Sequence, residues 1–540
     1  MKEPLARQIV LAGATGLLYP LCFPDFNVGA LAWVVLLPLH FAIAGAQPRR
    51  AFWIGWLTGL IAFAGTMSWV VTAMHLYGKM PLLASYAVMI LLTTYLGLYI
   101  ALYALAIAWI RKTLFPFSFF AAPFIWVTLE LLRTHLLSGL PWTLLGYSQY
   151  QWLQAIQIAD LTGVYGVSFL VVLVNAALSD VGLGALQRSR QPGSPFPLLS
   201  PTAATLGMVM TLLYGQAQLI ARPDAASPSR GGSDRSISIG LVQPNVDQAQ
   251  KWDAAFRRET LDRYARLTAQ AAKGSTLVIW PEAATPFLFE QESPYRLEVM
   301  ELARTHKVPL LFGSPAFRHF LNGRPYLLNS AYLLSPDGVI LGRYDKRHLV
   351  PFGEYIPLRP VLFFLDKLVE GIGDFEAGTD ATVLDLPIGS GADRRSIKFG
   401  VVICYEVIFP NLVREFVANG AQFMVTITND AWFGKSAAAF QHFGMVVLRA
   451  VENRVAFARS ANTGISGFID PQGRILHATP IFTKEVVIGR IPVGRVRTFY
   501  TQQGDLFAYG CVIITGLFLL VARLQTKVRT GGQGQERQRH

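Results

Sequence analysis

The feature that most constrains the fold of this chain is a series of long apolar runs, most of them in its first half. A helix needs about 20 mostly apolar residues to cross a bilayer. Since 52% of the residues are hydrophobic and only 15% are charged, one soluble core cannot bury the apolar surface. We therefore predict seven transmembrane helices within residues 1–222 and an eighth at 505–523. The predicted spans cover residues 8–24, 28–46, 52–75, 81–110, 115–136, 160–182, 198–220 and 505–523.

Basic residues gather at alternate ends of these runs, which indicates how the chain is oriented in the membrane. Lys and Arg are enriched in the cytoplasmic loops of membrane proteins. The alternate loops carry Arg49, Arg50, Arg111, Lys112, Arg188 and Arg190, and residues 524–540 form a basic tail. We expect both termini in the cytoplasm and residues 236–500 outside it. The net charge of +13 is then a topology signal, and we expect no nucleic-acid partner, which would need a basic stripe on one folded face.

Residues 236–500 differ in character from the rest of the chain, because short β runs alternate there with charged helical patterns. Buried β runs are predicted at Ile237–Val242, Thr276–Trp280, Pro309–Gly313, Lys398–Cys404 and Phe423–Thr428. Helical spacing covers Asp253–Lys273, Pro294–Lys307, Phe409–Ala418 and Phe440–Arg454, and hairpin turns are predicted at Ser335–Gly338 and Asp470–Gly473. The pattern favours a layered α/β domain.

Three segments each carry a titratable residue where a β run ends: Glu282 in Leu277–Glu282, Lys346 in Gly342–Lys346 and Cys404 in Gly400–Glu406. Sites assemble at the carboxyl ends of strands, because the sheet fixes the backbone there. A carboxylate can take the thiol proton, while an ammonium lowers the thiol pKa and stabilises an oxyanion. The backbone N–H of Tyr405 is a candidate second oxyanion donor. A lone cysteine is more often a buried apolar group, so the hypothesis depends on the joint pattern.

The motifs around these residues carry a family resemblance. Trp280-Pro281-Glu282, the run from Tyr344 to Tyr355 and Ile403-Cys404-Tyr405-Glu406 resemble the nitrilase (carbon–nitrogen hydrolase) superfamily, which uses a Glu–Lys–Cys triad on an αββα sandwich. With seven spans before this domain and one after it, the chain resembles the apolipoprotein N-acyltransferase family of bacterial inner membranes. The expected fold class is a multi-span α-helical membrane domain plus an α/β nitrilase-like αββα sandwich domain.

The resemblance implies a role for each motif residue: Glu282 is the base, Lys346 the oxyanion stabiliser and Cys404 the nucleophile. Glu354 is either a second carboxylate that orients Lys346 or shuttles protons, or a member of a structural salt bridge. Tyr405 and Glu406 are expected to support the nucleophile turn. The implied reaction moves an acyl chain from the sn-1 position of a phospholipid, with phosphatidylethanolamine as the expected donor, through a thioester to the α-amine of diacylglyceryl-cysteine in apolipoproteins. We expect no metal or diffusible cofactor.

Other segments receive alternative interpretations. Trp252 is a candidate contact for acyl chain or headgroup, or an ordinary core aromatic. Residues 357–373 are either a mobile apolar arm that covers the site or a packed helix. His442 is assigned no role.

Two other functions are considered for the whole chain. The first is a membrane-anchored amidase that hydrolyses a soluble amide, but one anchor would suffice for it. The second is a transporter or lipid-binding scaffold with a degenerate domain, which has no reason to keep Glu282, Lys346 and Cys404 together.

Overall fold

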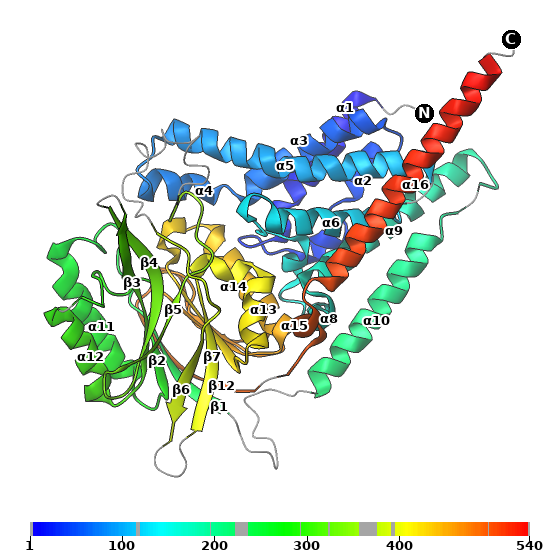
Figure 1. The fold of residues 1–540 in the computed structure, drawn as a ribbon. Helices are drawn as coiled ribbons and strands as arrows, with labels where there is room; N and C mark the ends of the chain where they lie inside the picture. Colours follow the sequence, from blue (N-terminus) through cyan, green and yellow to red (C-terminus); the bar gives the residue numbers. More distant parts are fainter. Residues whose placement is uncertain are drawn as a thin grey trace. The chain divides into compact units, whose positions relative to one another are not determined.

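The computed structural model describes residues 4–114, 119–194, 196–221, 236–291, 293–321, 324–355, 375–389, 395–494 and 496–537. The chain divides into two compact units (Figure 1). The helical unit comprises Met1–Ser68, Tyr86–Ala217 and Asp505–His540, and the sandwich unit comprises Trp69–Ser85 and Gln218–Gly504. The arm predicted at 357–373 lies outside the described residues.

The helical unit consists of α-helices joined by short 3-10 turns. Its α-helices are α1 (Leu5–Leu18), α2 (Leu37–Ile43), α3 (Pro48–Thr66), α5 (Leu82–Thr113), α6 (Ala122–His135), α7 (Leu153–Ile156), α8 (Ala159–Thr162), α9 (Val164–Arg190), α10 (Leu199–Ala221) and α16 (Leu506–Arg537). The 3-10 turns are η1 (Pro20–Cys22), η2 (Gly29–Trp33), η4 (Leu136–Ser138) and η5 (Leu145–Gln149).

Five helical segments of the described chain are long and apolar enough to cross a membrane: α1 with η1, α5, α9, α10 and the first part of α16. A sixth arises if α3 and the segment Trp69–Tyr77, which meet at an angle of 51°, form one bent span. The predicted spans 28–46 and 115–136 fall on the short segment Gly29–Ile43 and on α6, which has 14 residues. The arrangement of eight spans stays a prediction.

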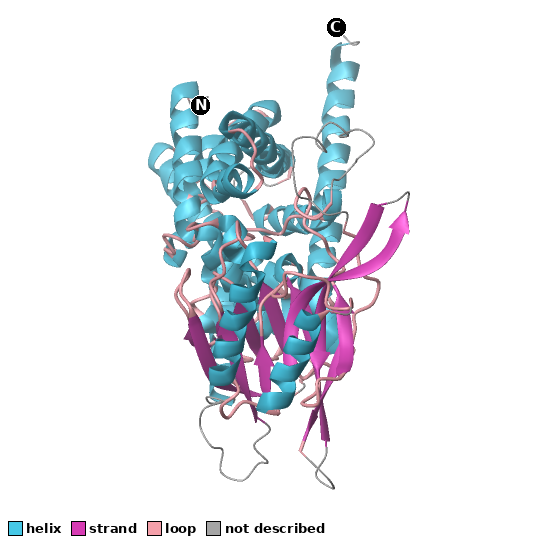
Figure 2. Cartoon of the chain, turned by 90° about the vertical axis from the view of Figure 1, so that its left-hand side faces the viewer, coloured by secondary structure: helices cyan, strands magenta, loops and turns pink. Residues whose placement is uncertain are grey.

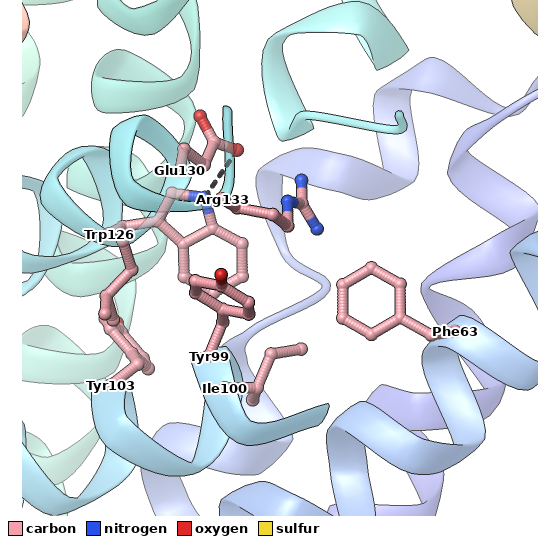
Figure 3. A pocket seen from close by; sticks show the side chains of 8 residues that line it. Phe63, Tyr99, Ile100, Tyr103, Trp126, Glu130 and Arg133 are labelled. Atoms are coloured by element: carbon pink, nitrogen blue, oxygen red, sulfur yellow. Dashed lines mark hydrogen bonds between the residues drawn. The ribbon is translucent and has the colours of Figure 1, made fainter. Parts of the chain in front are cut away.

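The interior of the helical unit holds polar groups that are paired within the protein. Glu130 on α6 accepts hydrogen bonds from the Trp126 indole at 2.9 Å and from the Leu145 backbone N–H at 2.7 Å. Such pairing is needed because a bilayer supplies no hydrogen-bond partners. The cavity beside Glu130 measures about 20 Å³, little more than one water molecule requires (Figure 3). It is lined by Phe63, Tyr99, Ile100, Tyr103, Trp126, Leu129, Glu130 and Arg133.

The sandwich unit is built on two six-stranded sheets, with strand orders β12-β1-β2-β3-β4-β5 and β11-β10-β9-β8-β7-β6. In each sheet three strands run parallel, and their neighbours pair antiparallel. The strands are β1 (Ser236–Gln243), β2 (Leu277–Ile279), β3 (Leu310–Leu321), β4 (Arg324–Leu334), β5 (Ile340–Asp345), β6 (Val383–Ile388), β7 (Arg395–Ile403), β8 (Phe423–Thr428), β9 (Phe457–Ala461), β10 (Gly467–Ile469), β11 (Ile475–Ala478) and β12 (Glu485–Pro492).

The two sheets pack face to face, and helices cover their outer faces (Figures 1 and 2). Ser460 on β9 donates a hydrogen bond to the carbonyl of Val242 on β1, which joins the sheets. Trp280 stacks on Tyr264 of α11 with ring centroids 4.4 Å apart, which ties that helix to the first sheet. The further elements of the unit are α4 (Trp69–Thr72), η3 (Ala73–Tyr77), η6 (Ala254–Phe256), α11 (Arg257–Ala271), α12 (Pro294–His306), η9 (Cys404–Ile408), α13 (Pro410–Ala418), η10 (Asp430–Phe433), α14 (Ala437–Asn453) and α15 (Phe499–Gln503).

The predicted fold class is confirmed, since helical spans accompany a two-sheet α/β sandwich. The predicted bounds of several elements were wrong, as at β3, which runs to Leu321 where the prediction ended at Gly313. The boundary at Cys404 matters most for the site. The strand predicted over Lys398–Cys404 ends at Ile403, and Cys404 begins η9 with φ of 52°. A left-handed backbone cannot continue a strand, so the cysteine side chain leaves the line of β7.

Candidate active site

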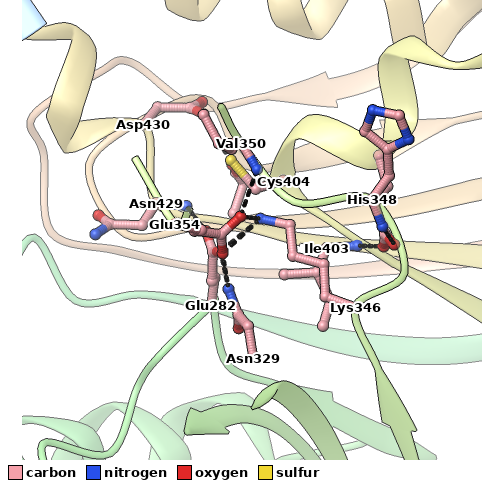
Figure 4. Close-up of polar contacts among 12 residues, drawn as sticks. Glu282, Asn329, Lys346, His348, Val350, Glu354, Ile403, Cys404, Asn429 and Asp430 are labelled. Carbon is pink, nitrogen blue, oxygen red and sulfur yellow. Dashed lines mark hydrogen bonds and ion pairs between the residues drawn. The ribbon is translucent and has the colours of Figure 1, made fainter. Parts of the chain in front are cut away.

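Glu282 is held by the loop that follows β2. The buried Trp280 anchors this loop, because its indole N–H donates to the Thr268 hydroxyl at 2.9 Å. One carboxylate oxygen of Glu282, Oε1, accepts from the Asn329 amide at 2.8 Å, and the other, Oε2, accepts from the backbone N–H of Asn429 at 3.0 Å. The carboxylate is therefore fixed by groups from both sheets (Figure 4).

Lys346 follows β5 directly, and its side chain is 1% exposed. Its ammonium lies 2.9 Å from Oε2 of Glu354 and 3.5 Å from Oε1 of Glu282. Burial alone would lower the pKa of Lys346, but the charges of Glu354 and Glu282 outweigh burial and raise it. Lys346 is therefore a fixed positive charge, suited to stabilise an oxyanion rather than to exchange protons.

Asn329 on β4 joins the two carboxylates, because its amide donates to Glu282 Oε1 and to Glu354 Oε1, both at 2.8 Å. Glu354 also accepts from the backbone N–H of Val350 at 2.8 Å. Asn329 was not predicted as a site residue. The available signal was an amide within the apolar run Leu327-Leu328-Asn329, where a polar residue needs a partner.

Cys404 is buried at the first position of the turn after β7, with its thiol beside Lys346 and the carboxylates (Figure 4). Burial raises the pKa of the thiol, the negative charge of Glu282 raises it further, and the charge of Lys346 lowers it by less. The ammonium of Lys346 lowers the thiol pKa as expected, but by less than burial and the charge of Glu282 together raise it. The thiol is therefore protonated at neutral pH, so its attack requires a base, and Glu282 is placed to serve.

Glu406 ties the nucleophile turn to the lysine loop. It accepts from the backbone N–H groups of Ile403 and Arg347, both at 2.7 Å, and of His348 at 3.1 Å. The hydroxyl of Tyr344 donates a fourth hydrogen bond at 2.7 Å. A carboxylate shared in this way fixes the end of β7 against the end of β5, which supports a positioning function for Glu406.

The other predicted site residues differ in placement. Tyr405 is buried, and its ring packs against Phe409 with centroids 5.2 Å apart. Trp252 is 49% exposed, and within the described residues no hydrogen bond or ring contact joins it to the other predicted site residues. Its neighbour Lys251, which was not predicted as a site residue, is buried and donates to the Glu282 carbonyl at 3.1 Å.

No group of His, Cys, Asp and Glu side chains suited to a metal ion occurs among the described residues. The side chains that the cluster does bring together are a thiol, two carboxylates and an ammonium. Such a set is chemically suited to acyl transfer through a covalent intermediate.

The fold and the site define the sandwich unit as a carbon–nitrogen hydrolase domain, and the family model of that description, "Carbon-nitrogen hydrolase", matches residues 238–500. A second family model, "Apolipoprotein N-acyltransferase N-terminal domain", matches residues 15–177. A protein named apolipoprotein N-acyltransferase from Geobacter metallireducens is 42% identical over 510 residues, which cover 94% of this chain and 93% of the relative. The chain therefore belongs to the apolipoprotein N-acyltransferase family, and it is an acyltransferase of the membrane.

Two further relatives with that name also match over nearly their whole length. The protein from Chlorobaculum tepidum is 30% identical over 97% of this chain and 98% of its own length, and the one from Azotobacter vinelandii is 33% identical over 96% and 95%. Among solved structures, an amidase of the nitrilase superfamily from Nesterenkonia matches 51% of this chain and 96% of its own, with 20% identity and a TM-score of 0.36. The family resemblance inferred from the sequence is confirmed.

Proposed function

We propose that this chain transfers an acyl group from the sn-1 position of a phospholipid to the N-terminal α-amine of diacylglyceryl-cysteine in apolipoproteins. Phosphatidylethanolamine is the expected donor, and the product is a triacylated lipoprotein. The observation that carries the proposal is the convergence of Glu282, Lys346 and Cys404 in one buried cluster at the ends of β2, β5 and β7. The names of the relatives support the choice of acceptor.

In the first half-reaction Glu282 takes the proton of the Cys404 thiol while the sulfur attacks the ester carbonyl. The resulting oxyanion is stabilised by the ammonium of Lys346, with the Tyr405 backbone N–H proposed as a second donor. Collapse breaks the ester C–O bond, and the lysophospholipid oxygen leaves with the proton that Glu282 had taken. A thioester on Cys404 remains.

In the second half-reaction the α-amine of the acceptor attacks the thioester carbonyl and loses a proton to Glu282. Collapse expels the sulfur of Cys404, which recovers that proton, and an amide is released. Transfer to an amine requires that water be kept out, because water would hydrolyse the thioester. The burial of Lys346 and Cys404 supports transfer over hydrolysis.

Glu354 is proposed to hold the ammonium of Lys346 in place rather than to react, since it contacts Lys346 at 2.9 Å and is fixed by Val350. Trp252 is proposed as a substrate contact because a half-exposed indole suits an interface between lipid and water. The positive-inside pattern supports a catalytic unit on the periplasmic side of a bacterial inner membrane with both termini in the cytoplasm.

The test uses purified full-length protein incubated with alkyne-tagged phosphatidylethanolamine. We expect a hydroxylamine-labile adduct that mass spectrometry places on the Cys404 peptide. Cys404→Ala should abolish the adduct, and Glu282→Gln and Lys346→Met should slow its formation at unchanged lipid binding. Absence of the adduct from the wild type, or equal labelling of Cys404→Ala, would refute the acyl-enzyme.

A further inference from the structure

Behind the nucleophile turn lies a buried cluster that the mechanism above does not use. His442 on α14 is fully buried, and its Nε2 lies 3.1 Å from the backbone carbonyl oxygen of Cys404. A carbonyl oxygen can only accept, so Nε2 carries the proton and donates. The residue after β7 is thus held through its carbonyl oxygen, while Glu406 binds the backbone N–H of the preceding Ile403.

Two charged residues contact the other ring nitrogen of His442, Nδ1. Asp430 and Arg459 are both buried and form an ion pair, with Arg459 Nη2 2.8 Å from Asp430 Oδ2. The Thr428 hydroxyl donates to Asp430 Oδ1 at 2.8 Å, and Arg459 Nε donates to the Ile465 carbonyl at 3.1 Å. The cluster is therefore anchored to the end of β8 and to β9, and both charges are paired as burial requires.

The protonation state of His442 follows from its neighbours. Asp430 Oδ1 and Arg459 Nη2 both lie 3.1 Å from Nδ1, so this nitrogen either donates to the carboxylate or accepts from the guanidinium. Burial lowers the pKa of His442, and the charge of Arg459 lowers it further, against the opposing effect of Asp430. The ring is therefore neutral, with Nδ1 accepting from Arg459 and Nε2–H donating to Cys404.

The bond matters because the backbone of Cys404 is strained. Its φ of 52° lies in the left-handed region, which a non-glycine residue adopts only when its surroundings enforce it. Release of the carbonyl would let the turn relax toward an extended backbone. That relaxation would swing the thiol away from Lys346 and Glu282.

We propose that His442, fixed by Asp430 and Arg459, is a positioning residue that holds the Cys404 carbonyl and thereby keeps the nucleophile in its left-handed turn. The inference rests on the proposed role of Cys404 as nucleophile. His442 does not touch the reacting atoms. It acts through the backbone of Cys404.

The test compares His442→Leu, which removes the donor at similar volume, with His442→Gln, whose amide N–H can still donate to the carbonyl. Val447→Ala serves as the matched control, because Val447 is a buried residue of the same helix. Three quantities are measured on the full-length protein: the rate constant of adduct formation with tagged phosphatidylethanolamine, the apparent lipid affinity, and the alkylation rate of Cys404 by iodoacetamide, read on its peptide.

We expect His442→Leu to slow adduct formation on the order of 10- to 100-fold at unchanged lipid affinity, as displacement of a reacting group does. Its alkylation rate should change as well. His442→Gln should recover a large part of the rate, and Val447→Ala should lower only the thermal midpoint.

The inference is overturned if His442→Leu forms adduct and reacts with iodoacetamide at wild-type rates, or if His442→Gln is no faster than His442→Leu. Failure of the proposed function itself looks different, since the wild type would then form no adduct. In that case equal alkylation of wild type and His442→Leu still overturns the positioning role, and unequal alkylation supports it.

Discussion

At the scale of single residues, the candidate site depends on how one buried ammonium is shared between two carboxylates. Lys346 contacts both Glu354 and Glu282, and the Asn329 amide keeps the two acids at the distance that allows this. Two adjacent carboxylates repel one another, so the ammonium and the amide are what stabilise the pair. Each of these groups is therefore coupled to the others.

Replacement of Asn329 by Leu should uncouple the carboxylates. Two buried acceptors lose their donors, so we expect a loss of about 1–3 kcal/mol in the free energy of unfolding, together with slower adduct formation on Cys404. Thermal unfolding and the tagged-lipid assay measure the two effects. Asn419→Leu, at an exposed position after α13, is the control and should leave both near wild type. A stable, fully active Asn329→Leu protein would contradict the coupling.

Lys251 makes the free energy of unfolding depend on pH. Burial lowers its pKa from 10.5 to about 8, although the charges of Glu282 and Cys404 oppose this. The unfolded chain then binds the proton more tightly than the folded one, so the charge costs stability below pH 8. That cost declines as the pH rises toward 10.5.

Compared with Lys251→Met, the wild type should therefore gain up to about 3 kcal/mol between pH 8 and pH 10. The measurement is the difference between the two thermal midpoints as a function of pH. Because the pKa of Lys251 is lowered in the folded protein, the stability of the wild type relative to Lys251→Met must rise with pH. A difference that stays constant from pH 7 to pH 10 would show that Lys251 is not held in a poorly solvating environment.

The sequence predicted Glu282, Lys346 and Cys404 as site residues because each directly follows a β run, and the structure brings their side chains together. Their catalytic roles stay predictions. Asn329 and His442 were not predicted, because their importance arises from partners far away in the chain. A polar residue in an apolar run signals that it needs a partner, but the sequence does not show which distant residue supplies it.

At the scale of elements, the ends of the strands set the geometry of the site. Gly313 on β3 lies against the backbone of the Glu282 loop. A Cβ added at Gly313 would lie 2.5 Å from the Ala283 nitrogen and 2.7 Å from the Glu282 Cα. Hydrogen bonds from Gly313 to Pro281 and from Ala284 to Gly313 prevent the two backbones from separating. Only glycine fits at this position.

Gly313→Ala should therefore displace the Glu282 loop. We expect a loss of about 1–3 kcal/mol in unfolding free energy and adduct formation that is slower on the order of 100-fold. Gly494→Ala is the matched control, because nothing lies within 4 Å of the added methyl group. Adduct formation by Gly313→Ala at the rate of Gly494→Ala would show that β3 does not position Glu282.

Element positions in the sandwich unit were well predicted where apolar runs were bounded by turn residues, as at β8, predicted and found at Phe423–Thr428. A turn at the nucleophile was predicted, but not that Cys404 itself leaves the strand. The contact of His442 with the Cys404 carbonyl exists only once the tertiary structure has formed, whereas Glu406 binds the N–H of the neighbouring Ile403 within the same turn. Local sequence preference would have continued the strand.

At the scale of the whole molecule, the chain joins a helical unit to an α/β sandwich unit. The charge pattern predicts which side of the membrane each loop faces. The three native cysteines are all buried, so new cysteines can report accessibility. Lys273 is exposed on the sandwich unit, and Gln191 is exposed in the loop after α9. Each is replaced by cysteine in a separate variant, Lys273→Cys and Gln191→Cys.

A membrane-impermeant maleimide should label Lys273→Cys in intact spheroplasts. Gln191→Cys should react only after the membrane is permeabilised, because its loop is predicted to face the cytoplasm. The wild type serves as the unlabelled control. The reverse pattern of labelling would contradict the proposed topology and place the active site on the cytoplasmic side.

Transfer of the acyl group from Cys404 to an amine is the central claim, and a chase of the isolated acyl-enzyme tests it most directly. The protein is first labelled with alkyne-tagged phosphatidylethanolamine, freed of excess lipid, and then mixed with a diacylglyceryl-cysteine peptide or with the same peptide acetylated on its α-amine. We predict that the tag moves to the free peptide as a hydroxylamine-stable amide, while the acetylated peptide receives none. Release of the tag as free fatty acid at the same rate with either peptide would contradict the account and identify a hydrolase.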